Sequence, residues 1–110
     1  MAKTSRNKMI LHRIQKMRTK VKINTQKIRE EMLINLQELF SLAKQQAQNK
    51  KLELEQRQKW IRVASYTAQV VNSLTKSFDE AQVTKDLEKL EKLIGEAVAK
   101  EKDRGVNTTS

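Results

Sequence analysis

No proline interrupts this sequence, and only two of its 110 residues are glycine. These are the residues that most often end or break helices, so long helices can form without interruption. Several segments place apolar residues three or four positions apart, which is the spacing of one helical face. The sequence therefore predicts an all-α protein, a small three-helix bundle over residues 27–102, with an N-terminal basic helical arm over 1–26 and a flexible tail over 103–110.

Three apolar stripes mark the helices of the predicted bundle. The first consists of Ile28, Met32, Leu36, Leu39, Phe40, Ala43 and Ala47. The second consists of Trp60, Ala64, Thr67, Val71, Leu74 and Phe78, broadened by Ile61, Val63, Ala68 and Val70. The third consists of Val83, Leu87, Leu90, Ile94 and Ala97. The second stripe is the widest, so we expect its helix to be central in the core.

The breaks between helices are marked by residues that favour N-caps. Asn24 and Thr25 form one such site, and we expect a helix over about 7–22 to end in a kink or cap there. An uninterrupted helix through Gln48 remains open, and so does a strand in TKVKINT, where polar and apolar residues alternate.

The last helix has two candidate starts. Asp79 can cap a turn with Gln82 three residues later, and Thr84 is a second candidate cap. Inside this helix, Gly95 either costs up to ~1 kcal/mol of stability relative to alanine or marks a close helix contact.

Charge divides the chain unevenly. The first 29 residues hold ten Lys or Arg and no Asp or Glu, and the other 81 residues hold thirteen of each sign, so the whole formal charge of +10 lies in this first quarter. Such a segment can neutralise nucleic-acid phosphates without reading the base sequence. The predicted nucleic-acid-binding residues are Lys3, Arg6, Lys8, Arg13, Lys16, Arg18, Lys20, Lys22, Lys27 and Arg29.

The basic segment also carries an apolar stripe, formed by Ile10, Ile14, Met17, Val21, Thr25 and Ile28. A featureless tail would not need this stripe, so we expect an arm that is helical or becomes ordered on a partner. A solubilising arm and an arm that binds an acidic protein surface or a lipid surface are the alternatives. The lipid surface is the weaker one, because the apolar side of the arm has no Trp or Phe.

The second candidate site lies around Trp60, in the segment RQKWIR. Tryptophan and arginine are enriched at protein-binding hot spots. The predicted partner-binding residues are Arg57, Lys59, Trp60, Arg62 and Tyr66. The alternative for Trp60 is a core position with its N–H at the surface.

Catalytic and membrane-spanning functions are not expected. Cysteine is absent, and the single histidine, His12, has no acidic residue near it in the sequence. No glycine-rich phosphate loop or metal-ligand spacing is present, so we expect no cofactor and no metal. The longest apolar runs are about three residues, far below the ~20 that cross a bilayer. These features favour a cytoplasmic, nucleoid-associated protein.

The segments RQKWIRVASYTAQVVNSLTKSFDE and DLEKLEKLIGEA, roughly residues 57–97, resemble one known family. It comprises the small helical accessory subunits that bind the replicative B-family DNA polymerase in archaea. The resemblance implies a non-catalytic subunit that binds a DNA polymerase through its bundle and stabilises it on DNA. Two alternatives remain: a small helical subunit of a nucleic-acid surveillance or ribonucleoprotein assembly, and a plain protein-interaction module.

Overall fold

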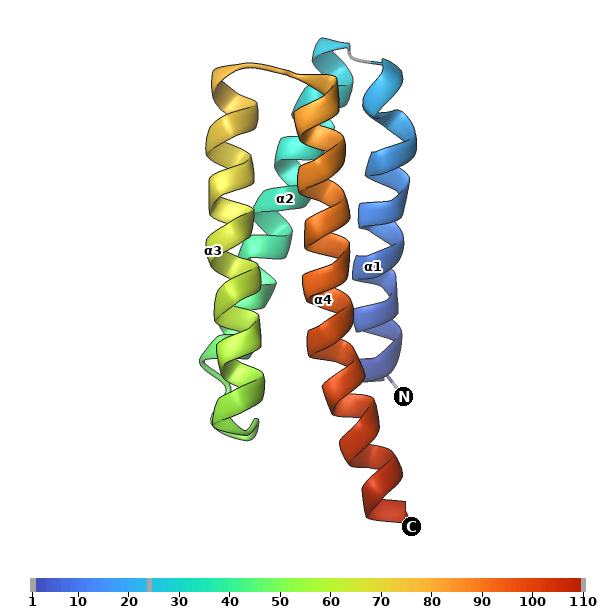
Figure 1. Ribbon diagram of the computed structural model, residues 1–110, viewed down its shortest axis with the longest axis vertical. Helices are drawn as coiled ribbons and strands as arrows, with labels where there is room; N and C mark the ends of the chain where they lie inside the picture. Colours follow the sequence, from blue (N-terminus) through green and yellow to red (C-terminus); the bar gives the residue numbers. More distant parts are fainter. Residues whose placement is uncertain (1, 24, 110) are drawn as a thin grey trace.

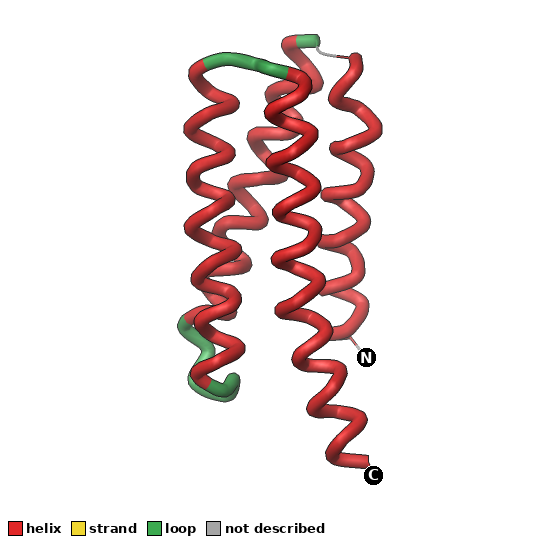
Figure 2. The backbone as a smooth tube through the Cα atoms, in the orientation of Figure 1, coloured by secondary structure: helices red, strands yellow, loops and turns green. Residues whose placement is uncertain are grey.

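The computed structural model describes the backbone of residues 2–23 and 25–109 and the side chains of residues 9–23 and 25–98. In this part of the chain there are four α-helices, α1 (Ala2–Lys20), α2 (Gln26–Ala47), α3 (Leu54–Lys76) and α4 (Glu80–Thr109), and a short 3₁₀ helix, η1 (Val21–Ile23), after α1. Consecutive helices run in opposite directions (Figure 1) and are joined by short turns (Figure 2).

The prediction of an all-α protein is confirmed, but the structure does not confirm a three-helix bundle with a separate arm. The basic segment forms α1, which packs mainly along α4 (Figure 1). Ile14, Met17 and Val21 are buried in the same core as the residues of the other helices. Their apolar stripe explains the difference, because it gives α1 a face to bury.

The apolar stripes predicted the core well. Among the residues of the three stripes, twelve are buried: Met32, Leu36, Leu39, Ala43, Trp60, Thr67, Leu74, Val83, Leu87, Leu90, Ile94 and Ala97. Val63 and Val70 are buried too, whereas Ile61 and Ala68 are exposed on the outer side of α3. The buried face of α3 is thus narrower than the sequence predicts.

The predicted break between α1 and α2 is confirmed. Thr25 has extended backbone angles, and its hydroxyl accepts a hydrogen bond of 3.2 Å from the backbone N–H of Ile28. Asn24, the other predicted cap residue, lies outside the described residues. The uninterrupted helix is therefore wrong, and TKVKINT forms the end of α1, η1 and the cap rather than a strand.

The start of α4 resolves the other choice of cap. The carboxylate of Asp79 accepts a hydrogen bond of 3.2 Å from the N–H of Gln82, and its carbonyl accepts one of 2.8 Å from the N–H of Val83. Thr84 lies inside the helix, where its hydroxyl donates to the carbonyl oxygen of Glu80. Residues 103–109 of the predicted tail continue α4.

Gly95 lies within α4, at a position where a side chain has room. A Cβ built on this residue meets no atom within 4 Å, so no close helix contact requires a glycine. We predict that Gly95→Ala raises the free energy of unfolding by up to ~1 kcal/mol, because alanine loses less backbone entropy in a helix. Chemical denaturation of both proteins measures the difference. Ala68→Gly, at an exposed position of α3, is the reverse control and should lower stability. A Gly95→Ala protein less stable than the wild type would contradict the prediction.

Candidate nucleic-acid interface

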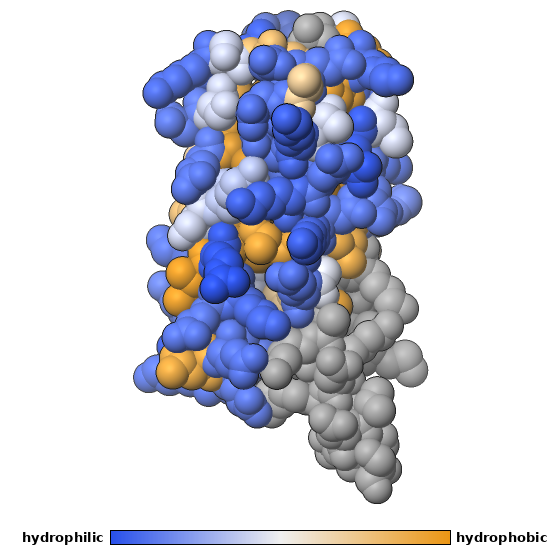
Figure 3. All heavy atoms as spheres, viewed as in Figure 1, coloured by the Kyte–Doolittle hydropathy of each residue, from blue (hydrophilic) through white to orange (hydrophobic). Residues whose placement is uncertain are grey.

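The molecular face that presents α4 is strongly hydrophilic, with apolar residues visible only in patches between polar ones (Figure 3). Seven of the ten predicted phosphate contacts have described side chains, on α1, η1 and the start of α2. The side chains of Lys3, Arg6 and Lys8 lie outside the described residues. The seven divide into cations paired within the protein, cations that face solvent, and Arg29.

Arg18 bridges α1 to α4. Its guanidinium lies 2.6 Å from the carboxylate of Glu91 and 3.3 Å from that of Glu88. Positions 88 and 91 are three residues apart and therefore neighbours on one face of α4. Arg18 is thus already held by two carboxylates, and a phosphate would have to displace them.

Arg13 and Lys20 bridge α1 to α2. Arg13 lies 3.4 Å from Glu38 and Lys20 lies 3.5 Å from Glu31, and all four side chains are substantially exposed. Exposed pairs of this kind contribute about 0–1 kcal/mol each. They orient α1 beside α2 but reduce the positive charge that these two residues offer to a ligand.

Lys16, Lys22 and Lys27 are exposed and form no ion pair with any other residue whose side chain is described. Lys16 lies on α1, Lys22 on η1 and Lys27 on the first turn of α2. These three lysines are hereafter called the free lysines. They can meet a phosphate without first breaking an internal ion pair.

Arg29 has a different role. Its guanidinium carbon lies 5.6 Å from the centre of the Phe78 ring, a geometry that attracts a cation to the ring face. The contact joins the first turns of α2 to the segment after α3, so Arg29 contributes to packing at this end of the bundle.

The predicted partner-binding residues on α3 do not form a free surface patch. Trp60 is fully buried, and its indole N–H finds no hydrogen-bond partner among the described residues. The alternative core position thus describes this conformation, except that the N–H is buried too, and the contact with a partner stays a prediction. The indole ring belongs to the core because the stripe of α3 passes through it. The Nε of Arg57 donates to the carbonyl oxygen of Ala47 at 3.0 Å. Lys59 is half-buried, and only Arg62 is exposed.

Tyr66 joins α3 to α4. Its hydroxyl donates a hydrogen bond of 2.9 Å to Oδ1 of Asp86, which also accepts one of 2.9 Å from the side-chain amide of Gln82. The Nζ of Lys89 lies 4.8 Å from the centre of the tyrosine ring. Asp86 is buried, so these two donors supply what water would otherwise provide to its carboxylate. The sequence predicts Tyr66 only as a partner-binding residue, because its hydrogen-bond partner Asp86 lies twenty positions away in the chain.

No group of three or more potential metal-ligand side chains occurs among the described residues. No helix in the described part of the chain has both the length and the apolar character needed to cross a membrane. His12 is exposed.

Sequence reasoning missed a groove between α1 and α2, which is lined by Met9, Met17, Leu42 and their neighbours. The sequence indicates this groove only through apolar stripes on two adjacent helices, and a stripe does not reveal how tightly two helices pack.

Comparison with known proteins adds no relative: no protein-family model matches this chain, and neither do curated proteins or solved structures.

The contact between Tyr66 and Asp86 predicts a loss of stability at alkaline pH. Burial of the hydroxyl, followed by its hydrogen bond to Asp86 and the charge of that carboxylate, raises the pKa of Tyr66 from 10.0 to about 12. The folded state therefore keeps this proton when the unfolded state has lost it. The stabilisation is complete below pH 10.0 and is lost as the pH rises toward about 12.

Tyr66→Phe should remove this component, so its free energy of unfolding should fall less steeply than that of the wild type across this window. Denaturation at stepped pH measures the slopes, and phenolate absorbance reports the pKa directly, since this is the only tyrosine. Asp86→Asn should lower that pKa. Equal slopes for wild type and Tyr66→Phe would contradict the assignment.

Proposed function

We propose that this protein is a non-catalytic, basic accessory subunit of a DNA-processing complex, and that it holds nucleic-acid phosphates through the free lysines. The observation that supports this most is the distribution of charge. All of the net charge of +10 arises in the first 29 residues, and within them the free lysines are exposed and have no ion-pair partner among the described side chains.

The expected mechanism is electrostatic. Lysine side chains displace counterions condensed on the phosphate backbone, and this release drives binding that weakens steeply with salt. The described surface has no array of exposed aromatic rings on which bases could stack, since Trp60 is buried and Phe40, Tyr66 and Phe78 are partly buried. We therefore expect weak selectivity for sequence.

In this proposal α1 works while packed in the bundle. Ion pairs hold Arg13, Arg18 and Lys20 against α2 and α4, which leaves the free lysines as the first contacts. A loosened α1 that becomes ordered on its ligand, as an arm separate from three helices, is the alternative form. In this alternative form, the cations that are now paired, Arg13, Arg18 and Lys20, would also contact phosphates.

The protein partner in the proposal is a DNA polymerase, docked on the bundle. Support for this choice comes from the resemblance of residues 57–97 to archaeal polymerase accessory subunits. A basic subunit fixed to a polymerase would raise the affinity of the assembly for DNA, because it adds phosphate contacts to those of the enzyme.

We predict that replacing the free lysines together, in Lys16→Gln, Lys22→Gln and Lys27→Gln, weakens binding to duplex DNA. The plot of log affinity against log salt should become shallower by up to about 3, since each phosphate contact contributes about 0.9. Titrations of labelled duplex between ~50 and ~200 mM salt measure the change.

The matched control replaces three exposed lysines outside this region, in Lys44→Gln, Lys51→Gln and Lys76→Gln. It removes the same charge, so a general effect of net charge would weaken both proteins equally. An unchanged slope in the first triple variant, or equal losses in the two, would overturn the proposed interface.

A further inference from the structure

The boundary between α1 and α2 is an open groove, because α1 packs mainly against α4. It contains two hollows, of about 250 Å³ and about 60 Å³. Arg13, Met17 and Asn35 line both, so the two hollows adjoin. Both hollows lie between α1 and α2, which run in opposite directions (Figure 1).

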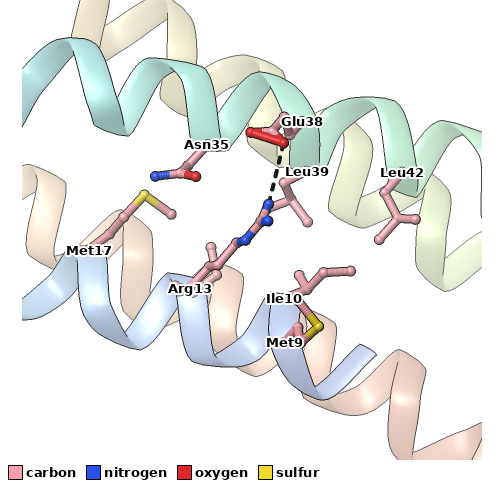
Figure 4. A pocket seen from close by; sticks show the side chains of 9 residues that line it. Met9, Ile10, Arg13, Met17, Asn35, Glu38, Leu39 and Leu42 are labelled. Atoms are coloured by element: carbon pink, nitrogen blue, oxygen red, sulfur yellow. Dashed lines mark hydrogen bonds and ion pairs between the residues drawn. The ribbon is translucent and has the colours of Figure 1, made fainter. Parts of the chain in front are cut away.

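Apolar side chains form the walls of the larger hollow. Met9, Ile10 and Met17 come from α1, and Leu39 and Leu42 face them from α2 (Figure 4). Met9 lines this hollow and has 56% of its surface exposed, so a partner can reach it. Methionines adapt their shape to varied apolar partners, so this wall suits a bound side chain.

The polar rim of the groove consists of three pairs of positions, each with one residue on α1 and one on α2, and the middle pair lacks a carboxylate. Arg13 reaches across to Glu38 (Figure 4), and Lys20 pairs with Glu31. Lys16 and Asn35 occupy the intermediate positions of α1 and α2, and both line the smaller hollow. The side chains of these two residues form no ion pair or hydrogen bond with another described residue, so the middle pair has a cation but no carboxylate.

We propose that this groove docks an amphipathic helix of a partner protein, with an apolar side chain in the larger hollow and a carboxylate paired with Lys16. The segment from Met9 to Lys20 is about 16 Å long, or three helical turns, which matches the reach of a short docked helix. Apolar anchors on successive turns, flanked by charge, are the usual pattern of helices bound in such grooves.

Charge determines the chemistry of this partner. The sequence of α1 contains no acidic residue, and the two glutamates of the opposite wall are already paired with Arg13 and Lys20. An incoming carboxylate therefore meets an unneutralised cation, whereas an incoming lysine would meet only carboxylates that are already paired. The occupant is consequently an acidic amphipathic helix.

This inference rests on the part of the proposed function that assigns protein docking to the bundle, and it moves the docking site from α3 to the α1–α2 groove. Docking in the groove and phosphate binding can fail separately, because Met9 carries no charge. Met9→Gln should weaken helix binding and leave the salt dependence of DNA binding unchanged.

The experiment uses the full chain, labelled at the methionine methyl groups, and a synthetic helical peptide with leucines along one face and glutamates beside them. We expect the peptide to shift the NMR signals of Met9 and Met17. Met9→Gln should weaken binding about tenfold, which corresponds to ~1.4 kcal/mol. Ile61→Gln, at a residue 51% exposed on α3, is the matched control and should bind like the wild type.

Charge reversal tests the carboxylate contact. Lys16→Glu should weaken binding of the glutamate peptide and strengthen binding of a peptide in which lysines replace the glutamates. Lys44→Glu, on an exposed position of α2, makes the same change in net charge and should do neither.

Three results would overturn the proposal. The first is absence of shifts at Met9 and Met17 with about 1 mM glutamate peptide. The second is equal loss of binding in the test and control variants. The third is a concentration-dependent dimer, seen by sedimentation, whose formation Met9→Gln prevents, because the groove would then hold a second copy of this chain.

Discussion

The orientation of α1 in the bundle depends on carboxylates supplied by other helices. Arg13, Lys16 and Lys20 lie three or four positions apart on one helix, and like charges at this spacing repel. Glu31 and Glu38 on α2 and the pair Glu88 and Glu91 on α4 receive cations of α1 and offset that repulsion. Part of the acidic charge in the rest of the chain therefore compensates the positive charge of α1.

The ion pairs orient α1, but apolar burial holds it. Ile14, Met17 and Val21 are almost fully buried, and burying such a side chain contributes ~1.5–3 kcal/mol. An exposed ion pair contributes about 0–1 kcal/mol. The joint at Thr25 makes this burial possible. An uninterrupted helix over residues 2–47 would extend about 69 Å at ~1.5 Å per residue, beyond the 48 Å length of the molecule, and would carry the stripe of α1 away from α4.

The features that could be predicted from the sequence are those whose interacting residues lie close together along the chain. Helix periodicity and caps are local, so the stripe of α4, the cap at Thr25 and the cap at Asp79 were all predictable. The docking of α1 was not, because Arg18 meets Glu91 across 73 positions of sequence. The choice between a core and a surface position for Trp60 stayed open in the sequence for a related reason. The cations that flank Trp60 suggest a surface position, but the packing of α3 against its neighbours determines which residues of the helix face the core.

The two proposals meet at Lys16. This residue is one of the free lysines, and it is also the cation of the middle pair, which it forms with Asn35 in the groove rim. A carboxylate docked there would remove one of the three phosphate contacts and leave Lys22 and Lys27, which line neither hollow of the groove. Since each phosphate contact contributes about 0.9 to the salt dependence on duplex DNA, an occupied groove should lower that slope by about 0.9 without abolishing binding. Helix docking and phosphate binding would therefore be coupled through a single side chain, and the coupling needs no change in the fold.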